Sequence, residues 1–308
     1  MRKWLITAGK LAVFVLVVWF VRGTLLDAWR QLGERRWELE PRWLAAAGAT
    51  YALGLLPAGL FWWHLLRRYG ATVRLGETLR AYYIGHLGKY VPGKAMVVFL
   101  RVGFIPRNRI HGGLAAAAVF AETLTMMAVG AALAAATLAV RLRDERALFW
   151  GAIALAFLAG VPTIPPLFRF LVRLLGVGRL DPLVNRQVDN IGWATLGVGW
   201  VTMLLTWCGL AASLWMTMKA LGVDSPGFWY DLPAYVAAVS LAMVAGFLSL
   251  IPGGLGVRDV ILVKLLVRLF HCSAAEAAVA SGLLRLIWLV AELIVSAMLY
   301  LVGKPRSE

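Results

Sequence analysis

Two Pro-Gly pairs interrupt an otherwise strongly apolar chain, and they limit its possible folds more than any other feature. The first lies in Tyr90-Val91-Pro92-Gly93-Lys94, and the second in Leu250-Ile251-Pro252-Gly253-Gly254. Lipid offers no hydrogen-bond partners, so a backbone broken at membrane depth persists only where protein or a polar cavity surrounds it. The alternative is that each Pro-Gly pair marks a tight turn between two short helices.

Composition places the chain among polytopic membrane proteins. Of its 308 residues, 61% are hydrophobic and 15% are charged, whereas soluble domains carry about a quarter charged residues. The formal charge of +15 comes from basic residues that punctuate apolar runs. This pattern indicates membrane orientation and contact with anionic lipid rather than nucleic-acid binding. Neither the cysteines nor the histidines have metal-ligand spacing, so no metal site or cofactor is expected.

Six apolar stretches approach the roughly 20 residues that a membrane span needs. They are residues 4–21, 43–66, 113–140, 147–164, 191–218 and 277–302. Two further regions, residues 79–105 and 232–270, are apolar hairpins folded at the Pro-Gly pairs, and each is either a re-entrant pair of half-helices or two short full spans. The predicted fold class is therefore an all-α polytopic membrane protein with about six full spans plus two broken re-entrant hairpins, eight or more helices in all.

The distribution of arginine and lysine predicts that both termini are cytoplasmic, in a prokaryotic inner membrane. Basic residues gather around the first hairpin, in the connection from 165 to 190 and at the C-terminus. The segment 22–42 contradicts this pattern, because it carries five arginines on the opposite side. The amphipathic, basic stretch 167–180 is expected to lie along the inner surface.

An inverted internal repeat follows from the order of the spans. Three full spans separate the hairpins, so the first hairpin opens from the cytoplasm and the second from outside. Each half reads as span, broken hairpin, span, with one half at about 43–140 and the other at about 191–302 of a single membrane domain covering 1–308. This is the sequence pattern of transporters whose site lies between inverted repeats.

Ionisable side chains inside apolar spans are the first candidates for a site, because each costs about 2.5–3.5 kcal/mol to insert. Glu122 is the only charge in its span, and it either serves as a counter-charge or proton carrier in transport or forms a salt bridge to an arginine on a neighbouring helix. Arg285 and Glu292 share one helix face with Ser281. They either neutralise each other or contact a substrate.

Basic residues beside the two breaks are the second group of candidates. Arg258 and Asp259 follow the second break, where a helix N-terminus would favour an anion such as lipid phosphate; the alternative is a salt bridge at the helix end. In the first hairpin, Lys94 and Arg101 would attract anionic headgroups. For Lys89, a long side chain that extends to the polar membrane interface is at least as good an explanation as attraction of headgroups.

Two stretches resemble a known family. They are the run from Gly85 to Lys94 (GHLGKYVPGK) leading to Arg101, and the run from Phe247 to Asp259 (FLSLIPGGLGVRD). With Glu122 and Arg285, they are similar to the flippase-like transmembrane family found in the membrane half of lysylphosphatidylglycerol synthases, from about residue 43 onward. The family often has glutamate at the position of Asp259, so the aspartate is a departure at the site.

The resemblance implies movement of a charged lipid, or a lipid-linked group, between membrane leaflets. The chain is similar to stand-alone members, which lack the soluble aminoacyl-transferase domain, so aminoacyl transfer is not expected of it. No Walker A loop or G-x-S-x-G elbow is present in the sequence, which disfavours an ATPase or a hydrolase. The alternatives are an integral membrane enzyme or accessory subunit in lipid headgroup modification, and a small-solute transporter. Expected partners are membrane lipids with anionic or amino headgroups, and a second copy or a partner enzyme.

Overall fold

The computed structural model describes residues 39–91, 95–106, 109–141, 146–174, 189–223, 227–249, 254 and 256–302. Within these residues every regular element is helical, which confirms the all-α class. The predicted first span at 4–21 lies outside the described residues. So do five of the residues at the breaks: Pro92, Gly93, Lys94, Pro252 and Gly253.

The described elements are, in chain order, α2 Pro41–Gly54, α3 Leu56–Arg68, α4 Leu75–His86, the 3-10 turn η1 Leu87–Tyr90, α5 Ala95–Gly103, α6 Gly112–Arg141, α7 Arg146–Gly160, η2 Val161–Thr163, α8 Pro165–Leu174, α11 Trp193–Ala220, α12 Phe228–Leu248, α13 Val257–Phe270 and α14 Ala274–Val302. Pro57 lies in the first turn of α3 and interrupts the backbone hydrogen bonds between α2 and α3, because proline has no N–H to donate.

Five described helical segments are long and apolar enough to cross a membrane. They are Pro41–Arg68, formed by α2 and α3, then α6, α11, α12 and α14. Four of these coincide with predicted spans, and α7 with α8 forms a bent pair, at 75°, where the span at 147–164 was expected. The fold is that of an integral membrane protein.

The two hairpins differ in the length of their arms. In the first, α4 has 12 residues and α5 has 9, so neither reaches the roughly 20 residues of a full span. In the second, α12 has 21 residues and is itself a candidate span, whereas α13 has 14. The description as a pair of half-helices therefore fits the lengths of the first hairpin only.

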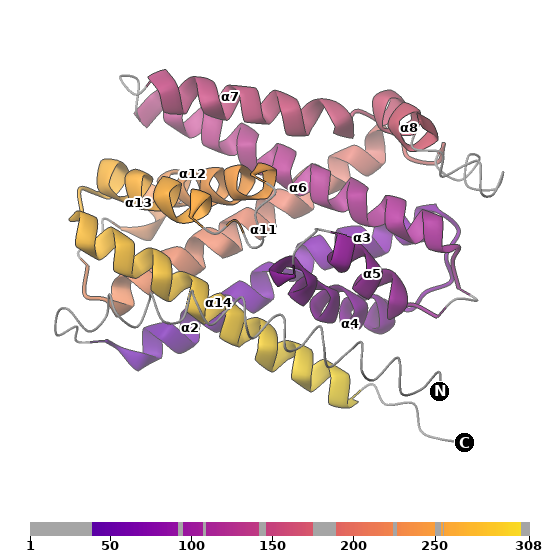
Figure 1. Ribbon diagram of the computed structural model, residues 1–308, viewed down its shortest axis with the longest axis horizontal. Coiled ribbons are helices and arrows are strands. Elements are labelled where there is room, and N and C mark those ends of the chain that lie inside the picture. The colour runs from indigo at the N-terminus through magenta and orange to yellow at the C-terminus, as the bar shows by residue number, and fades with distance from the viewer. Residues whose placement is uncertain are drawn as a thin grey trace.

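The long helices pack side by side around both hairpins. The main neighbours are α11 with α2, α6 with α7 and α12, and α14 with α2, α4 and α13. In Figure 1 the first hairpin, α4 and α5, lies in the right half of the molecule, and α12 and α13 lie in the left half. The two hairpins thus lie in opposite halves of the helix bundle in this view.

Small residues let α2 and α11 approach closely. A Cβ atom added at Gly209 would lie 2.6 Å from the Cα of Gly54, so neither position has room for a side chain. Next to this contact, Ser213 Oγ donates to the Ala47 carbonyl at 2.8 Å and accepts from Trp288 Nε1 at 2.9 Å. Close glycine contacts and buried hydroxyl bonds are the usual means of joining helices in a membrane.

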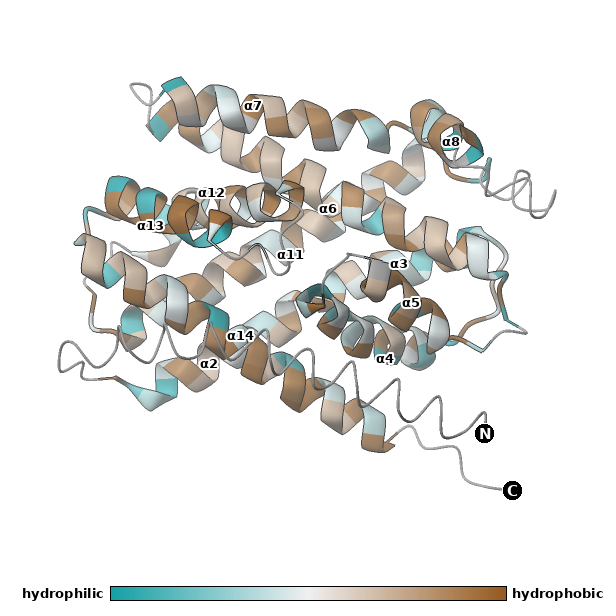
Figure 2. Ribbon diagram, in the orientation of Figure 1, coloured by the Kyte–Doolittle hydropathy of each residue, from teal (hydrophilic) through white to brown (hydrophobic). Residues whose placement is uncertain are grey.

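The outer faces of the long helices are apolar. Figure 2 shows hydrophilic residues gathered mainly near helix ends, with few between them. Large exposed hydrophobic side chains include Phe157, Leu158, Val201, Leu205, Ile294 and Leu301. A surface of this kind is suited to lipid rather than to water.

Two polar contacts hold helix ends and connections together. Arg141 Nη1 donates to Asp231 Oδ1 at 3.0 Å, and this bond joins the end of α6 to the start of α12. Asn190 Nδ2 donates to the Arg68 carbonyl at 3.2 Å, so the connection before α11 lies beside the end of α3. The second contact joins two regions that the distribution of basic residues predicts to lie on one side of the membrane.

Candidate functional site

A cavity of about 190 Å³ lies where the two hairpins meet. Its polar lining comprises His86, Lys89, Arg101, Glu122, Thr123, Arg258 and Arg285. Its apolar lining includes Val97, Val98, Val119, Phe120, Met126, Met127, Met243 and Phe247. Residues on both sides of each Pro-Gly break are present, from Tyr90 and Val91 to Val97 in the first hairpin, and from Phe247 to Gly254 and Arg258 in the second.

Glycine lets the arms of the first hairpin close against each other. A Cβ atom at Gly85 on α4 would lie 2.4 Å from Arg101 Cγ and 3.0 Å from Arg101 N on α5. At Gly88 it would lie 2.6 Å from the backbone nitrogen of Val97. Arg101 is thereby held deep in the protein with 2% of its surface exposed.

Arg101 is neutralised by Glu122 on α6. Its Nη1 donates to Glu122 Oε2 at 2.7 Å, and Tyr82 Oη donates to Glu122 Oε1 at 3.1 Å. The guanidinium carbon of Arg101 also lies 4.0 Å from the centre of the Tyr82 ring. Of the two alternatives for Glu122, the salt bridge to an arginine on a neighbouring helix is the contact that the structure contains.

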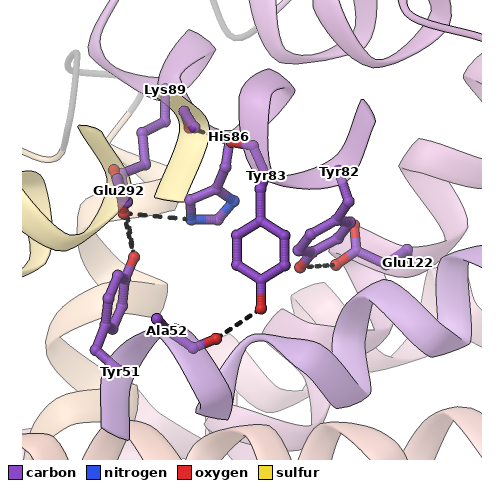
Figure 3. A network of polar contacts seen from close by, with 9 residues as sticks. Tyr51, Ala52, Tyr82, Tyr83, His86, Lys89, Glu122 and Glu292 are labelled. Atoms are coloured by element: carbon purple, nitrogen blue, oxygen red, sulfur yellow. Dashed lines mark hydrogen bonds and ion pairs between the residues drawn. The ribbon is translucent and has the colours of Figure 1, made fainter. Parts of the chain in front are cut away.

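A second ionic group surrounds Glu292 on α14. Figure 3 shows Lys89 and Tyr51 reaching this carboxylate from different helices, with His86 beside it. Both Lys89 Nζ and Tyr51 Oη donate to Glu292 Oε1, and His86 Nε2 lies 3.8 Å from the same oxygen. Lys89 therefore pairs with a buried acid. The alternative, that its side chain extends to the membrane interface, does not explain its position.

Arg285 pairs with Asp259 rather than with Glu292. Its Nη2 lies 2.7 Å from both carboxylate oxygens of Asp259, and Ser281 Oγ donates to Asp259 Oδ1 at 3.2 Å. Mutual neutralisation of Arg285 and Glu292 was therefore the wrong alternative. Two turns of one helix separate these groups by roughly 10 Å along its axis, and neighbouring helices offer closer partners.

Asp259 also organises the start of α13. Its Oδ2 accepts the backbone N–H of Gly256 at 3.2 Å, which satisfies one of the free donors at the helix N-terminus. The φ angle of Gly256 is +79°, a backbone conformation that favours glycine. One aspartate thus fixes both the helix start and the side chain of Arg285.

Arg258 is the exception among these basic residues. It is 8% exposed, and its guanidinium carbon lies 4.6 Å from the centre of the Trp288 ring. Its Nη2 is buried without a hydrogen-bond partner, as are the Nε atoms of Arg101 and Arg285. Unlike those two arginines, Arg258 has no ion pair with an acid in the described part of the chain. A buried cation without a counter-charge is costly, so this group is available to an anionic ligand.

Most of the predicted site residues meet at this cavity. Glu122, Arg101, Arg258, Arg285 and Gly254 line it, while Asp259 and Glu292 bind residues that line it. Lys94, Pro92, Gly93, Pro252 and Gly253 lie outside the described residues. The cavity joins residues that are far apart in the sequence.

Aromatic residues of the site were not predicted from the sequence. Tyr82 was not among the predicted site residues, yet it is fully buried and binds Glu122. Tyr51 and Trp288 stack with ring centres 4.4 Å apart beside Glu292 and Arg258. A useful signal was present for Tyr82 and His86, since their spacing of one helical turn puts two polar groups on the same face.

Fold and site together define a polytopic α-helical membrane protein with a charged cavity between two helical hairpins. The chain belongs to the family described as the lysylphosphatidylglycerol synthase TM region, whose model matches residues 7–296. The match begins well before residue 43 and includes most of the predicted first span. This family relates to lipid headgroup modification or translocation. No curated protein matches the chain.

Proposed function

We propose that this protein translocates a charged phospholipid, or a lipid-linked group, between the membrane leaflets. The observation that carries the proposal is the buried, unpaired Nη2 of Arg258 beside a cavity bounded by both hairpins. A phosphate oxygen would supply the missing acceptor through a charge-assisted hydrogen bond, which is among the stronger polar contacts.

The cavity walls suit an amphiphile. Apolar side chains from α5, α6 and α12 line much of it. One of them, Phe120, has 53% of its surface exposed, so this wall of the cavity is accessible to an apolar chain. A lipid headgroup would occupy the charged region while its chains stay among apolar residues.

An inverted repeat, which would give access to the site from two sides, forms part of the proposal. The hairpins lie in opposite halves of the bundle in Figure 1, and residues of both line one cavity. We propose that the first hairpin enters from the cytoplasmic face and the second from the outer face, with repeat halves at 43–140 and 191–302. A site reached in this way from either face is the basis of alternating access.

Three ion pairs would govern such access, because each joins a hairpin to another element. Arg101 and Glu122 join α5 to α6, Lys89 and Glu292 join η1 to α14, and Asp259 and Arg285 join α13 to α14. Movement of either hairpin relative to the rest of the bundle would break at least one of these ion pairs. The phosphate of an entering lipid would replace the carboxylate as the partner of the released cation.

Reconstitution in liposomes tests the proposal. Purified protein is expected to move a fluorescent phospholipid to the inner leaflet, where an impermeant reductant added outside cannot quench it. Empty liposomes and liposomes with an unrelated helical membrane protein are the controls. Folded protein that moves none of a panel of anionic, zwitterionic and aminoacylated lipids would contradict translocation.

Headgroup modification is the second candidate, and the family description, which names a synthase, favours it. The two functions differ in what cells lose when the protein is deleted. Translocation predicts a lipid that is present but confined to the wrong leaflet. Modification predicts that a lipid species is missing from total extracts.

A further inference from the structure

We infer that the site selects a lipid whose headgroup carries one net negative charge, a phosphodiester with an uncharged alcohol, over zwitterionic and aminoacylated lipids. The inference deepens the proposed function and rests on it. It follows from the charges around the cavity and from the hydrogen bonds that these charges already make.

The charge balance of the described cluster is positive. Four cations, Lys89, Arg101, Arg258 and Arg285, face three carboxylates, those of Glu122, Asp259 and Glu292. Three ion pairs use all three acids, and Arg258 is left over. One negative charge on a ligand restores neutrality in a region where an uncompensated charge is expensive.

The acceptors of the cluster are already occupied, which disfavours an ammonium headgroup. Both oxygens of Glu122 and both of Asp259 accept hydrogen bonds from protein donors. Glu292 Oε2 has no hydrogen-bond partner, but Glu292 is absent from the cavity lining and is already paired with Lys89. An ammonium group would have to take a carboxylate from an existing pair and leave a second cation unpaired.

The size of the cavity agrees with a small headgroup. Since one water needs a cavity volume of roughly 10–15 Å³, a cavity of about 190 Å³ has room for roughly 13–19 waters. A phosphate with a short alcohol fits this space. The Arg258 guanidinium, held over the Trp288 ring, would bind the phosphate at one end.

Equilibrium binding in detergent tests the selectivity without requiring transport. Wild-type protein is saturated with a fluorescent phosphatidylglycerol and competed with phosphatidylglycerol, phosphatidylethanolamine and lysyl-phosphatidylglycerol of identical acyl chains. We expect the anionic lipid to compete at least about tenfold better than either of the others, because each of the others brings an ammonium group that would leave a second protein cation unpaired. Equal competition, or the reverse order, overturns the inference.

Variants locate the selectivity at Arg258. Arg258→Gln is expected to remove the preference for the anionic lipid, and Arg258→Lys is expected to keep part of it, since the charge remains. Arg68→Gln is the matched control, because it removes one positive charge from an exposed position at the end of α3. An unchanged preference in Arg258→Gln overturns the inference, and if that variant does not fold, the wild-type competition decides.

The outcome separates this inference from the proposed function. Selective binding of the anionic lipid without any flux in liposomes would contradict translocation and leave the selectivity standing. Flux of all three lipids at one rate, with equal competition, would contradict the selectivity and leave translocation standing.

Discussion

The first and second hairpins place an arginine in the same local setting, but the two arginines have different partners. In each, a glycine on the first arm faces an arginine on the second arm: Gly85 faces Arg101, and Gly246 faces Arg258. In each, the guanidinium also lies over an aromatic ring, Tyr82 at 4.0 Å and Trp288 at 4.6 Å. Only Arg101 has a carboxylate partner, Glu122.

This difference separates a structural charge from one available to a ligand. Glu122 stands on α6 opposite Arg101, and together they tie the first hairpin to the bundle. In the second hairpin the acid next to the arginine, Asp259, is engaged by Arg285 and by the start of α13. The same local arrangement therefore stabilises one half of the molecule and leaves a free buried cation in the other.

Glu122→Gln gives the largest expected effect. It leaves Arg101 charged, buried and without its counter-charge, so the free energy of unfolding is expected to fall by about 3–5 kcal/mol. Denaturant unfolding in detergent measures the change, and Arg101→Gln combined with Glu122→Gln should recover part of the loss. A Glu122→Gln protein as stable as wild type but inactive would show that the charge of Glu122 serves transport instead.

Arg258→Gln tests the arginine of the second hairpin, which has no carboxylate partner in the described part of the chain. It removes no partner from a carboxylate, so the loss of stability should not exceed the contact with Trp288, about 0.5–2 kcal/mol, and removal of an unpaired buried charge offsets part of this loss. Lipid flux in liposomes, at equal protein incorporation, should fall by about 10- to 100-fold, the value of one charge-assisted hydrogen bond. Flux equal to that of the Arg68→Gln control would contradict the assignment of Arg258.

The facing glycines predict a graded pair of effects. At Gly85 a Cβ would lie 2.4 Å from Arg101 Cγ and 3.0 Å from its backbone nitrogen, whereas at Gly246 it would lie 3.0 Å from Arg258 Cβ. Gly85→Ala should therefore destabilise by about 1–3 kcal/mol, as overpacking does, and Gly246→Ala by less. Thermal unfolding of both variants checks the order, and a more destabilising Gly246→Ala would contradict it.

Ser281→Ala gives the smallest expected effect. It removes one hydrogen bond to Asp259, whose other bonds to Arg285 and Gly256 remain. A loss of about 0.5–1.5 kcal/mol in the free energy of unfolding is expected, with lipid flux close to wild type. A collapse of flux in this variant would mean that Ser281 itself contacts the lipid.

Much of the helical arrangement could be predicted from the sequence. Apolar runs of span length identified α6, α11, α14 and the combined α2 and α3, because only the length and composition of one segment decide whether it can cross a membrane. The Pro-Gly breaks also marked both hairpins. They did not reveal that α12 alone is span-length, since Pro233 lies inside this helix without ending it.

The partners of the site residues could not be predicted in the same way. Local spacing put Arg285 and Glu292 on one face, but their partners, Asp259 and Lys89, come from other elements. The pairing of Arg101 with Glu122 likewise depends on how α5 packs against α6. Such contacts are set by tertiary packing, which a single sequence does not encode in any local pattern.

The central claim is that Arg258 is the buried cation to which a lipid phosphate binds between the two hairpins. A structure of the protein determined in nanodiscs of phosphatidylglycerol tests it most directly. The account predicts a lipid phosphate in the cavity, with an oxygen about 2.7–2.9 Å from Arg258 Nη2. A structure in which Arg258 is paired with a protein carboxylate, with no lipid phosphate in the cavity, would contradict it.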